Sequence, residues 1–225
     1  MSPLQLFYIF IVLATFAPIQ AIQYQLINNA TGTPGGTRFE YEIGIPCSKQ
    51  TLEFATNFIW QTFKQSDEGD RKNYEEVTMV VESFVGAAAY VLSNTINVNS
   101  DYIANYQGDV KNEVIGLLYH ETTHVWQWFS NNEAPSGLIE GIADYVRLKA
   151  ALAPLNWVKR GSGARRDEGY AVTAYFLEYC NWLKEGFVAE LNALMKDSYS
   201  DDFFMQLLGK SVDELWNDYK SLYGN

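Results

Sequence analysis

Histidine and cysteine are scarce in this chain, with only two of each among its 225 residues. A nucleophilic site built on serine or cysteine needs a histidine to activate it, and both histidines here lie in one motif that indicates a different chemistry. G-x-G-x-x-G and Walker patterns are missing, which argues against these two nucleotide-binding loops. Low-complexity tracts and repeats of about 20–50 residues are absent as well. The sequence therefore excludes repeat architectures and several common classes of active site.

Basic side chains are outnumbered: 16 lysines and arginines stand against 27 aspartates and glutamates, a net charge of −11. Binding to nucleic acid needs a basic surface, so we expect no nucleic-acid partner. We interpret the acidity as solvated surface charge, with a preference for cationic substrates as the weaker alternative. With 48% hydrophobic and 19% charged residues, the chain has the composition of a globular protein with enough apolar material for a core.

Long apolar runs are confined to the first 21 residues, which contain no charged side chain. The run from Leu4 to Ala17 is shorter than the ~20 residues that span a bilayer, and Pro18 and Ala21 follow it at a small-residue cleavage point. We predict a secretory signal peptide over residues 1–21 and an extracellular mature chain with no stable membrane association. Because the start of the segment lacks a lysine or arginine, an uncleaved anchor is the alternative.

Export would allow the two cysteines, Cys47 and Cys180, to form a disulfide. Such a bond would close a long loop and contribute about 4–5 kcal/mol in the chain-entropy description. Two free buried thiols are the alternative, and spacing does not decide between them. Asn29 begins an Asn-Ala-Thr glycosylation sequon, which also fits export.

Hydrophobic periodicity predicts strands in the first half of the chain and helices in the second. Ile22 to Thr37 is polar and rich in glycine, which is typical of a flexible lead-in or a hairpin loop. Strands are predicted at Arg38–Ile45, Val77–Val85 and Ala88–Val98, and a helix at Lys49–Phe63 with Ser48 as its cap. Gly86 is expected to form a turn or bulge.

The second half predicts a series of helices. They run from Asp109 to about Phe129, Gly137 to Ala151, Gly169 to Leu183, Phe187 to Met195, Phe203 to Leu208 and Val212 to Tyr223. Ser136 is the expected cap of the second helix, and Ser211 begins a capping box for the last. Strands followed by helices predict an α+β fold.

The two histidines lie in the stretch YHETTHVWQ, residues 119–127. Residues four apart return to nearly the same face of a helix, so His120 and His124 can converge on one metal ion. Zn²⁺ accepts such nitrogens. Glu121 lies about 100° around the helix, where it can serve as the general base of an H-E-x-x-H site. The alternative is that both histidines are ordinary surface residues.

Two ligands are too few for zinc, and no third histidine exists. Glu140 lies 16 residues after His124 on the next predicted helix, and we assign it as the third ligand. Asp144 shares a face with Glu140 and can accept the second N–H of a metal-bound histidine. The alternative is that Glu140 pairs with Arg147 or Lys149.

Small residues on the same predicted helix bear on how closely it can pack. We predict that Gly137, Gly141 and Ala143 let it approach the H-E-x-x-H helix closely. The alternative for Gly141 is a simple helix defect that costs about 1 kcal/mol.

A donor to the oxyanion would assist hydrolysis, and without another histidine a tyrosine is the expected source. We name Tyr170 as the first candidate and Tyr145 as the second, although either can be an ordinary packed aromatic. Zinc itself is inferred from ligand type, and another divalent ion could occupy such a site.

Several segments together resemble the plant basic secretory protein family. They are LLYHETTHVWQW (117–128), GLIEGIADYVRLKA (137–150), Trp157–Lys159, GYAVTAYFLEYCNWL (169–183), GFVAELNALM (186–195), YSDDFF (199–204) and GKSVDELWNDYK (209–220). The resemblance covers about Arg38 to Tyr223. It implies an extracellular zinc-dependent peptidase associated in plants with defence. In this resemblance His120, His124 and Glu121 match the metal and base positions, and Glu140 with Asp144 matches the glutamate helix of gluzincins.

The resemblance also implies a zincin-like metallopeptidase fold in a single catalytic domain, residues 22–225. Its expected parts are a strand-rich region (38–100) with an N-terminal twisted mixed sheet, followed by an active-site helix and a helical C-terminal part (109–223). The Ala88–Val98 strand would be an edge strand that pairs with extended substrate, unless it lies inside the sheet. One departure is the acidic charge, since proteins of this family are often basic.

Three functions remain open at this point. The first is a secreted zinc peptidase that acts on a peptide or protein substrate. The second is a catalytically silent defence or binding protein that keeps the zinc. The third is a secreted structural module without metal.

Overall fold

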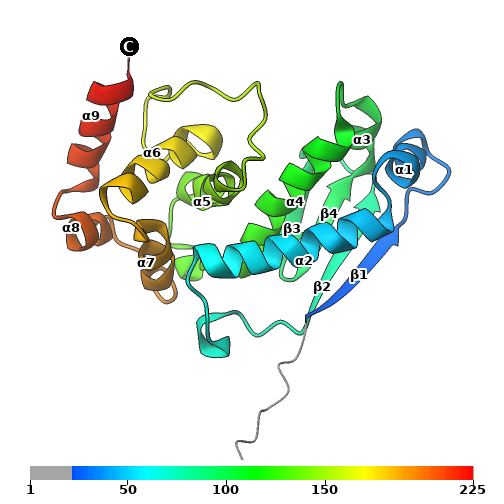
Figure 1. The fold of residues 1–225 in the computed structure, drawn as a ribbon, viewed down its shortest axis with the longest axis horizontal. Coiled ribbons are helices and arrows are strands. Elements are labelled where there is room, and N and C mark those ends of the chain that lie inside the picture. Colours follow the sequence, from blue (N-terminus) through cyan, green and yellow to red (C-terminus); the bar gives the residue numbers. More distant parts are fainter. Residues whose placement is uncertain (1–21, 225) are drawn as a thin grey trace, which may run out of the picture.

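The computed structural model describes residues 22–224, so the predicted signal peptide lies outside the described residues. A small sheet with two long helices forms one half of the molecule, and shorter helices form the other (Figure 1). The strands are β1 (Gln23–Asn28), β2 (Glu76–Glu82), β3 (Ala89–Leu92) and β4 (Thr95–Asn99). Within these residues, no helix combines the length and the apolar character that a membrane span requires. The α+β prediction is confirmed.

The predicted helices all occur in the predicted order, and α1 and α3 are additional. They are α1 (Pro34–Arg38), α2 (Ile45–Thr62), α3 (Ser100–Asn105), α4 (Val110–Trp126), α5 (Ser136–Lys149), α6 (Tyr170–Leu183), α7 (Phe187–Leu194), α8 (Asp202–Leu208) and α9 (Val212–Tyr223). The predicted capping box of α9 is confirmed: Ser211 accepts from the amide of Glu214, whose side chain bonds back to the Ser211 amide. α5 begins one residue earlier than predicted, at Ser136, with Pro135 as its cap.

The prediction of a lead-in or hairpin loop from Ile22 to Thr37 is wrong at both ends, since β1 occupies its first part and α1 its last. Gln23–Asn28 forms β1, which pairs in parallel with β2. This strand lies at the edge of the sheet, and its side chains are at most half-buried, so its polar sequence carries little trace of burial. Only pairing with a strand some 50 residues away, with Gln23 opposite Glu76, makes it a strand.

The predicted strand Arg38–Ile45 is also wrong. Thr33 caps α1, and a π-helical turn at Phe39–Ile43 follows and leads into α2. The alternating pattern that suggested a strand breaks at Tyr41, which is 86% exposed, whereas Phe39 and Ile43, one helical turn apart, are buried. Helical spacing therefore decides which apolar side chains reach the core.

The predicted strand Ala88–Val98 is a hairpin in the structure. β3 pairs antiparallel with β4, and the strand order β1-β2-β4-β3 puts β3 at an edge and β4 inside the sheet. The edge-strand expectation is thus confirmed for Ala89–Leu92 and wrong for Thr95–Asn99. β2, predicted as Val77–Val85, ends at Glu82.

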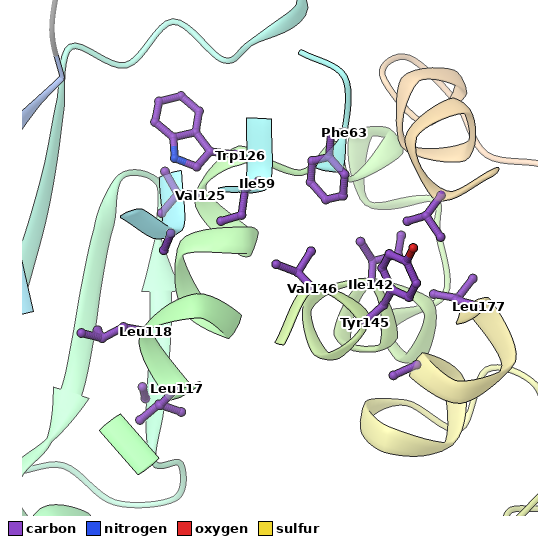
Figure 2. Packing of buried hydrophobic residues seen from close by; sticks show 14 of the residues in the cluster. Ile59, Phe63, Leu117, Leu118, Val125, Trp126, Ile142, Tyr145, Val146 and Leu177 are labelled. Atoms are coloured by element: carbon purple, nitrogen blue, oxygen red, sulfur yellow. The ribbon is translucent and has the colours of Figure 1, made fainter. Parts of the chain in front are cut away.

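The two long helices α2 and α4 pack on each other and on one face of the sheet. The sheet contributes every second residue of β2 to this contact. Buried side chains from α2, α4, α5 and α6 then form one continuous core; Ile59, Leu118, Trp126, Ile142 and Leu177 are among them (Figure 2). The continuous core fixes the relative positions of α4 and α5.

The two cysteines lie on different helices, Cys47 on α2 and Cys180 on α6. Both are free, and Cys180 is fully buried. The alternative of two free buried thiols is therefore confirmed for Cys180, whereas Cys47 is free but only half-buried. Asn29 is exposed in the turn after β1, and its glycosylation stays a prediction.

Candidate metal centre

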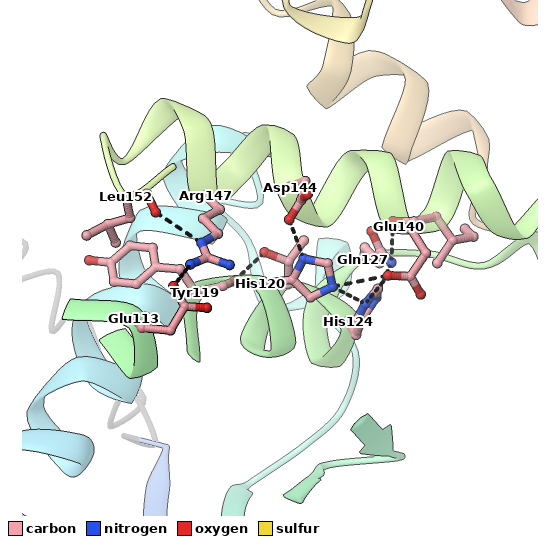
Figure 3. A network of polar contacts seen from close by, with 11 residues as sticks. Glu113, Tyr119, His120, His124, Gln127, Glu140, Asp144, Arg147 and Leu152 are labelled. Atoms are coloured by element: carbon pink, nitrogen blue, oxygen red, sulfur yellow. Dashed lines mark hydrogen bonds and ion pairs between the residues drawn. The ribbon is translucent and has the colours of Figure 1, made fainter. Parts of the chain in front are cut away.

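α4 carries both histidines on the side that faces α5. Asp109 begins the helix by accepting a hydrogen bond from the amide of Asn112, and apolar residues such as Leu118 and Val125 bury the side toward the sheet and α2. The two helices run antiparallel, since His124 lies beside Glu140 and His120 beside Asp144 (Figure 3). A polar seam therefore lies between two helices that the core holds in place.

The nitrogens of the two imidazoles and one oxygen of Glu140 converge closely. His120 Nε2 lies 3.1 Å from His124 Nε2 and 3.2 Å from Glu140 Oε2. His124 Nε2 lies 3.6 Å from the same carboxylate oxygen. Ligands about 2.1 Å from a tetrahedral zinc ion stand roughly 3.4 Å apart, so the three separations match one coordination shell. These are the residues that the sequence predicted as ligands, and they form the one such cluster found among the described residues.

The second nitrogen of each ring has its own partner. His120 Nδ1 lies 2.7 Å from Asp144 Oδ1, with both side chains buried, as predicted for Asp144. His124 Nδ1 lies 2.7 Å from the side-chain amide nitrogen (Nε2) of Gln127. Gln127 is fully buried, and the sequence analysis missed it. Gln127 follows the last residue of α4 and has an extended backbone, so helical spacing gave no signal for its contact with His124.

The electrostatics of the cluster favour positive charge. Burial by itself would lower the pKa of His120, but hydrogen bonds to Asp144 and Glu140 and the nearby charges of Glu121 and Asp144 raise it to about 10. Burial would raise the pKa of Glu140, yet the two histidines outweigh burial and lower it. Carboxylates outnumber cationic groups here, so the field that favours a proton also favours a metal cation.

Glu121 lies next to the ligands but is not one of them. Its side chain is buried and borders the cleft over the histidines. Burial raises its pKa, and the charges of Glu140 and Asp144 act in the same direction against the two histidines. A carboxylate with a raised pKa is better matched to accept a proton near neutral pH.

The two tyrosine candidates have different surroundings. Tyr170 is the first residue of α6, borders the cleft and stacks on His120, with ring centroids 6.1 Å apart and an interplanar angle of 14°. Its φ of 44° is rare for a residue with a side chain, and such strain is often found at functional sites. Tyr145 is 3% exposed in the hydrophobic core (Figure 2). The candidacy of Tyr145 is therefore wrong.

A second buried cluster lies at the other end of the α4–α5 seam. Arg147 donates to Glu113 Oε2 at 2.8 Å and to the Leu152 carbonyl at 3.0 Å. Tyr102 and Tyr106 donate to the same carboxylate, at 3.0 and 3.3 Å. The alternative in which Arg147 pairs with Glu140 is thus wrong.

The glycines of α5 allow close packing, but against a different neighbour from the one predicted. A Cβ on Gly141 would lie 2.2 Å from the Thr173 side chain on α6, and one on Gly137 would lie 1.8 Å from the Asp167 carbonyl oxygen. The small residue that opens the α4–α5 contact is Gly116 on α4, where a Cβ would lie 2.6 Å from Arg147 Nε. The prediction of a close approach holds, and its partner is corrected to α6.

A cleft of about 900 Å³ lies over the cluster. One wall is β3 with the loop before it, from Gly86 to Val91. The segment between α5 and α6 also lines the cleft, with Trp157 and Val158. His120, Glu121, His124, Glu140 and Tyr170 all border this cleft, so they share one accessible space.

Two comparisons with known proteins find relatives of this chain. A family model described as "Peptidase of plants and bacteria" matches residues 19–219. A curated relative, the basic secretory protease of Boswellia serrata, is 45% identical over 58 residues. That match covers 26% of this chain and 66% of the relative. No solved structure matches significantly, so the zincin-like fold stays a prediction. With the family model covering most of its length, the chain belongs to the basic secretory protein family, whose model describes peptidases of plants and bacteria.

Proposed function

We propose that this protein is a secreted zinc-dependent metallopeptidase. The observation that carries the proposal is the triangle of His120 Nε2, His124 Nε2 and Glu140 Oε2, with sides of 3.1, 3.2 and 3.6 Å, at the base of a cleft. Two imidazoles and one carboxylate are a donor set that catalytic zinc sites use, with the fourth position left for water or substrate. Family membership supports a peptidase in the same direction.

His120, His124 and Glu140 would hold the metal, and Asp144 would orient His120 by accepting its Nδ1–H. Zinc bound there supplies Lewis-acid polarisation of a carbonyl and makes water a stronger nucleophile near neutral pH. The surplus of carboxylates around the two rings supports a cation as the occupant.

Glu121 is the proposed general base. Its carboxylate borders the cleft beside the ligands, where it takes the proton of the attacking water and passes it to the leaving amine. Tyr170 is the proposed donor to the oxyanion, because its ring stacks on His120 at the cleft wall. Gly169, which has a φ of 101°, and the strained Tyr170 direct this side chain over the site.

A peptide substrate is supported by the edge strand on the cleft wall. The backbone amide of Asn99 donates to the Ala88 carbonyl at 2.9 Å, so the alternation of an antiparallel pair turns the backbone groups of Ala89 and Val91 away from β4. These groups can pair with an extended peptide. Secretion is supported by the predicted signal peptide and by the name of the Boswellia relative, and the association of the family with plant defence suggests a role there.

Replacing Glu121 with Gln tests this function. We expect the purified Glu121→Gln variant to bind zinc as the wild type does and to hydrolyse denatured protein at least about 100-fold more slowly. Equal hydrolysis by the two proteins would overturn the assignment of the base. A wild type that binds zinc without any hydrolysis would favour the catalytically silent alternative, and one without metal would favour the structural module.

A further inference from the structure

Gln127 is a hydrogen-bond partner of the His124 ring that the proposed chemistry does not yet use. Its amide nitrogen lies 2.7 Å from His124 Nδ1 and 3.3 Å from the carbonyl oxygen of Ile139. The amide oxygen is buried and has no hydrogen-bond partner among the described residues. The side chain itself is 0% exposed, so water does not readily supply the missing partner.

The orientation of this amide decides which nitrogen of His124 carries the proton. An amide N–H only donates, so the arrangement in the structure makes Nδ1 an acceptor and leaves the ring proton on Nε2. Nε2 is the atom that faces His120 and Glu140, at 3.1 and 3.6 Å. A metal ligand needs a lone pair on that nitrogen, which requires the proton on Nδ1 and an acceptor beside it.

A half-turn of the amide supplies that acceptor. It exchanges the two amide atoms and brings Oε1 to the position 2.7 Å from Nδ1. After the exchange, Nε2 of Gln127 no longer donates to the Ile139 carbonyl. This nitrogen instead occupies the former position of Oε1, where no hydrogen-bond partner lies among the described residues. Each orientation therefore leaves one buried amide atom unsatisfied, and the tautomer of His124 chooses between them.

We propose that Gln127 is a positioning residue for the metal site, and this rests on the proposed zinc function. With metal bound, its amide oxygen accepts the Nδ1–H of His124 and fixes Nε2 as a ligand. With the opposite orientation, its amide nitrogen holds the proton on Nε2 and opposes binding. The two amide orientations pair with the two tautomers of the ring, so the change releases one proton from Nε2 to solvent in the cleft and takes up one proton from solvent at Nδ1. Gln127 thus holds the Nδ1 side of His124 as Asp144 holds that of His120. Unlike the carboxylate of Asp144, the amide of Gln127 can turn and either accept or donate.

Two substitutions separate the roles of the amide. Gln127→Glu offers only acceptors at neutral pH, so it favours the tautomer that binds metal. In Gln127→Met, the methionine side chain has a length similar to that of glutamine, and it offers Nδ1 no strong hydrogen-bond donor or acceptor. By chelator competition, we expect Gln127→Met to bind zinc 10–100-fold more weakly than wild type, at about the usual cost of losing such a partner. Gln127→Glu should bind at least as tightly as wild type.

Histidine ¹⁵N spectra give a readout that simple packing would not change. We expect metal-free wild type to carry the His124 proton on Nε2, and both metal-free Gln127→Glu and zinc-loaded wild type to carry it on Nδ1. Equal zinc affinity of Gln127→Met and wild type, or a bare Nδ1 in the zinc-loaded protein, would overturn the proposal.

Gln65 provides a matched control. It is also buried, its Oε1 also lacks a partner among the described residues, and its amide nitrogen bonds only the Trp126 carbonyl, at 3.4 Å. Gln65→Met should leave zinc affinity unchanged, and an equal loss there would reduce the Gln127 effect to packing. If wild type binds no zinc, the proposed function fails, while the metal-free spectra of wild type and Gln127→Glu still decide the role of Gln127.

Discussion

The two ends of the seam between α4 and α5 are both buried and polar, yet their charges are balanced differently (Figure 3). At one end, the carboxylate of Glu113 receives one arginine and two tyrosine hydroxyl groups. At the other end, Glu121, Glu140 and Asp144 surround His120 and His124, and no lysine or arginine side chain forms an ion pair with them among the described residues. The first end is complete as it stands, whereas the second favours an added cation.

This difference separates stability from function along a single helix pair. Removing the Arg147 partner of Glu113 should lower the free energy of unfolding, while the metal affinity of the folded protein stays the same. Breaking the histidine end should affect metal binding while the chain still folds, because the apolar core that holds α4 and α5 together is unchanged.

The largest expected effect is at the balanced end. Arg147→Met leaves Glu113 buried without its cation, and both side chains are 8% exposed. We expect the free energy of unfolding to fall by about 3–5 kcal/mol, measured by denaturant titration. The double variant Glu113→Gln with Arg147→Met should recover part of that loss. A loss below about 1 kcal/mol, or a loss of zinc affinity in the folded protein, would remove the distinction between the two ends.

The next effect is on metal affinity. A zinc-binding free energy of about 10–16 kcal/mol in a four-ligand site corresponds to about 3 kcal/mol for each ligand. We therefore expect Glu140→Ala to weaken zinc binding by at least about 100-fold in chelator competition. The metal-free variant should still fold, at a somewhat lower denaturant midpoint than wild type, because the two histidines stabilise the ionised Glu140 in the folded state. Unchanged affinity would mean that another residue is the third ligand.

A smaller effect is expected from the proposed oxyanion donor. Tyr170→Phe keeps the ring that stacks on His120 and removes only the hydroxyl group. We expect kcat to fall about 100-fold, with zinc affinity and unfolding free energy unchanged. Wild-type kcat in this variant would show that the hydroxyl group takes no part in the reaction.

The smallest effect is expected from Tyr145. Tyr145→Phe should leave peptide hydrolysis unchanged, because the side chain lies in the core. Burial raises the pKa of Tyr145 to about 12 from 10.0. Its neutral form therefore stabilises the fold fully below pH ~10, and this contribution is lost as the pH rises through about 12. Between pH ~10 and 12, the unfolding free energy of Tyr145→Phe should fall less steeply than that of wild type. A change in the kcat of this variant would contradict the placement of Tyr145 in the core.

Sequence patterns were most informative where local signals act alone. The capping box at Ser211 and the H-E-x-x-H spacing are set by helix geometry, so α9 and the convergence of the two histidine side chains were predicted correctly. Glu140 and Asp144 followed from helical spacing and from the chemical need for acceptors.

Other features depend on contacts between distant parts of the chain, which local pattern does not encode. β1 exists because it pairs with β2, and Phe39 lies in a helical turn because Ile43, and not Tyr41, reaches the core. Gly141 packs on α6 because of how α5 and α6 cross, which single-helix periodicity does not reveal. Gln127 reaches His124 from an extended position just past the end of α4, which helical spacing does not predict.

The metal content of the purified protein, measured by elemental analysis after dialysis against dilute zinc, tests the central claim most directly. We expect one zinc ion per wild-type chain and none in a folded His120→Ala variant. A wild-type chain that retains no divalent metal, or equal zinc in the His120→Ala variant, would contradict the account.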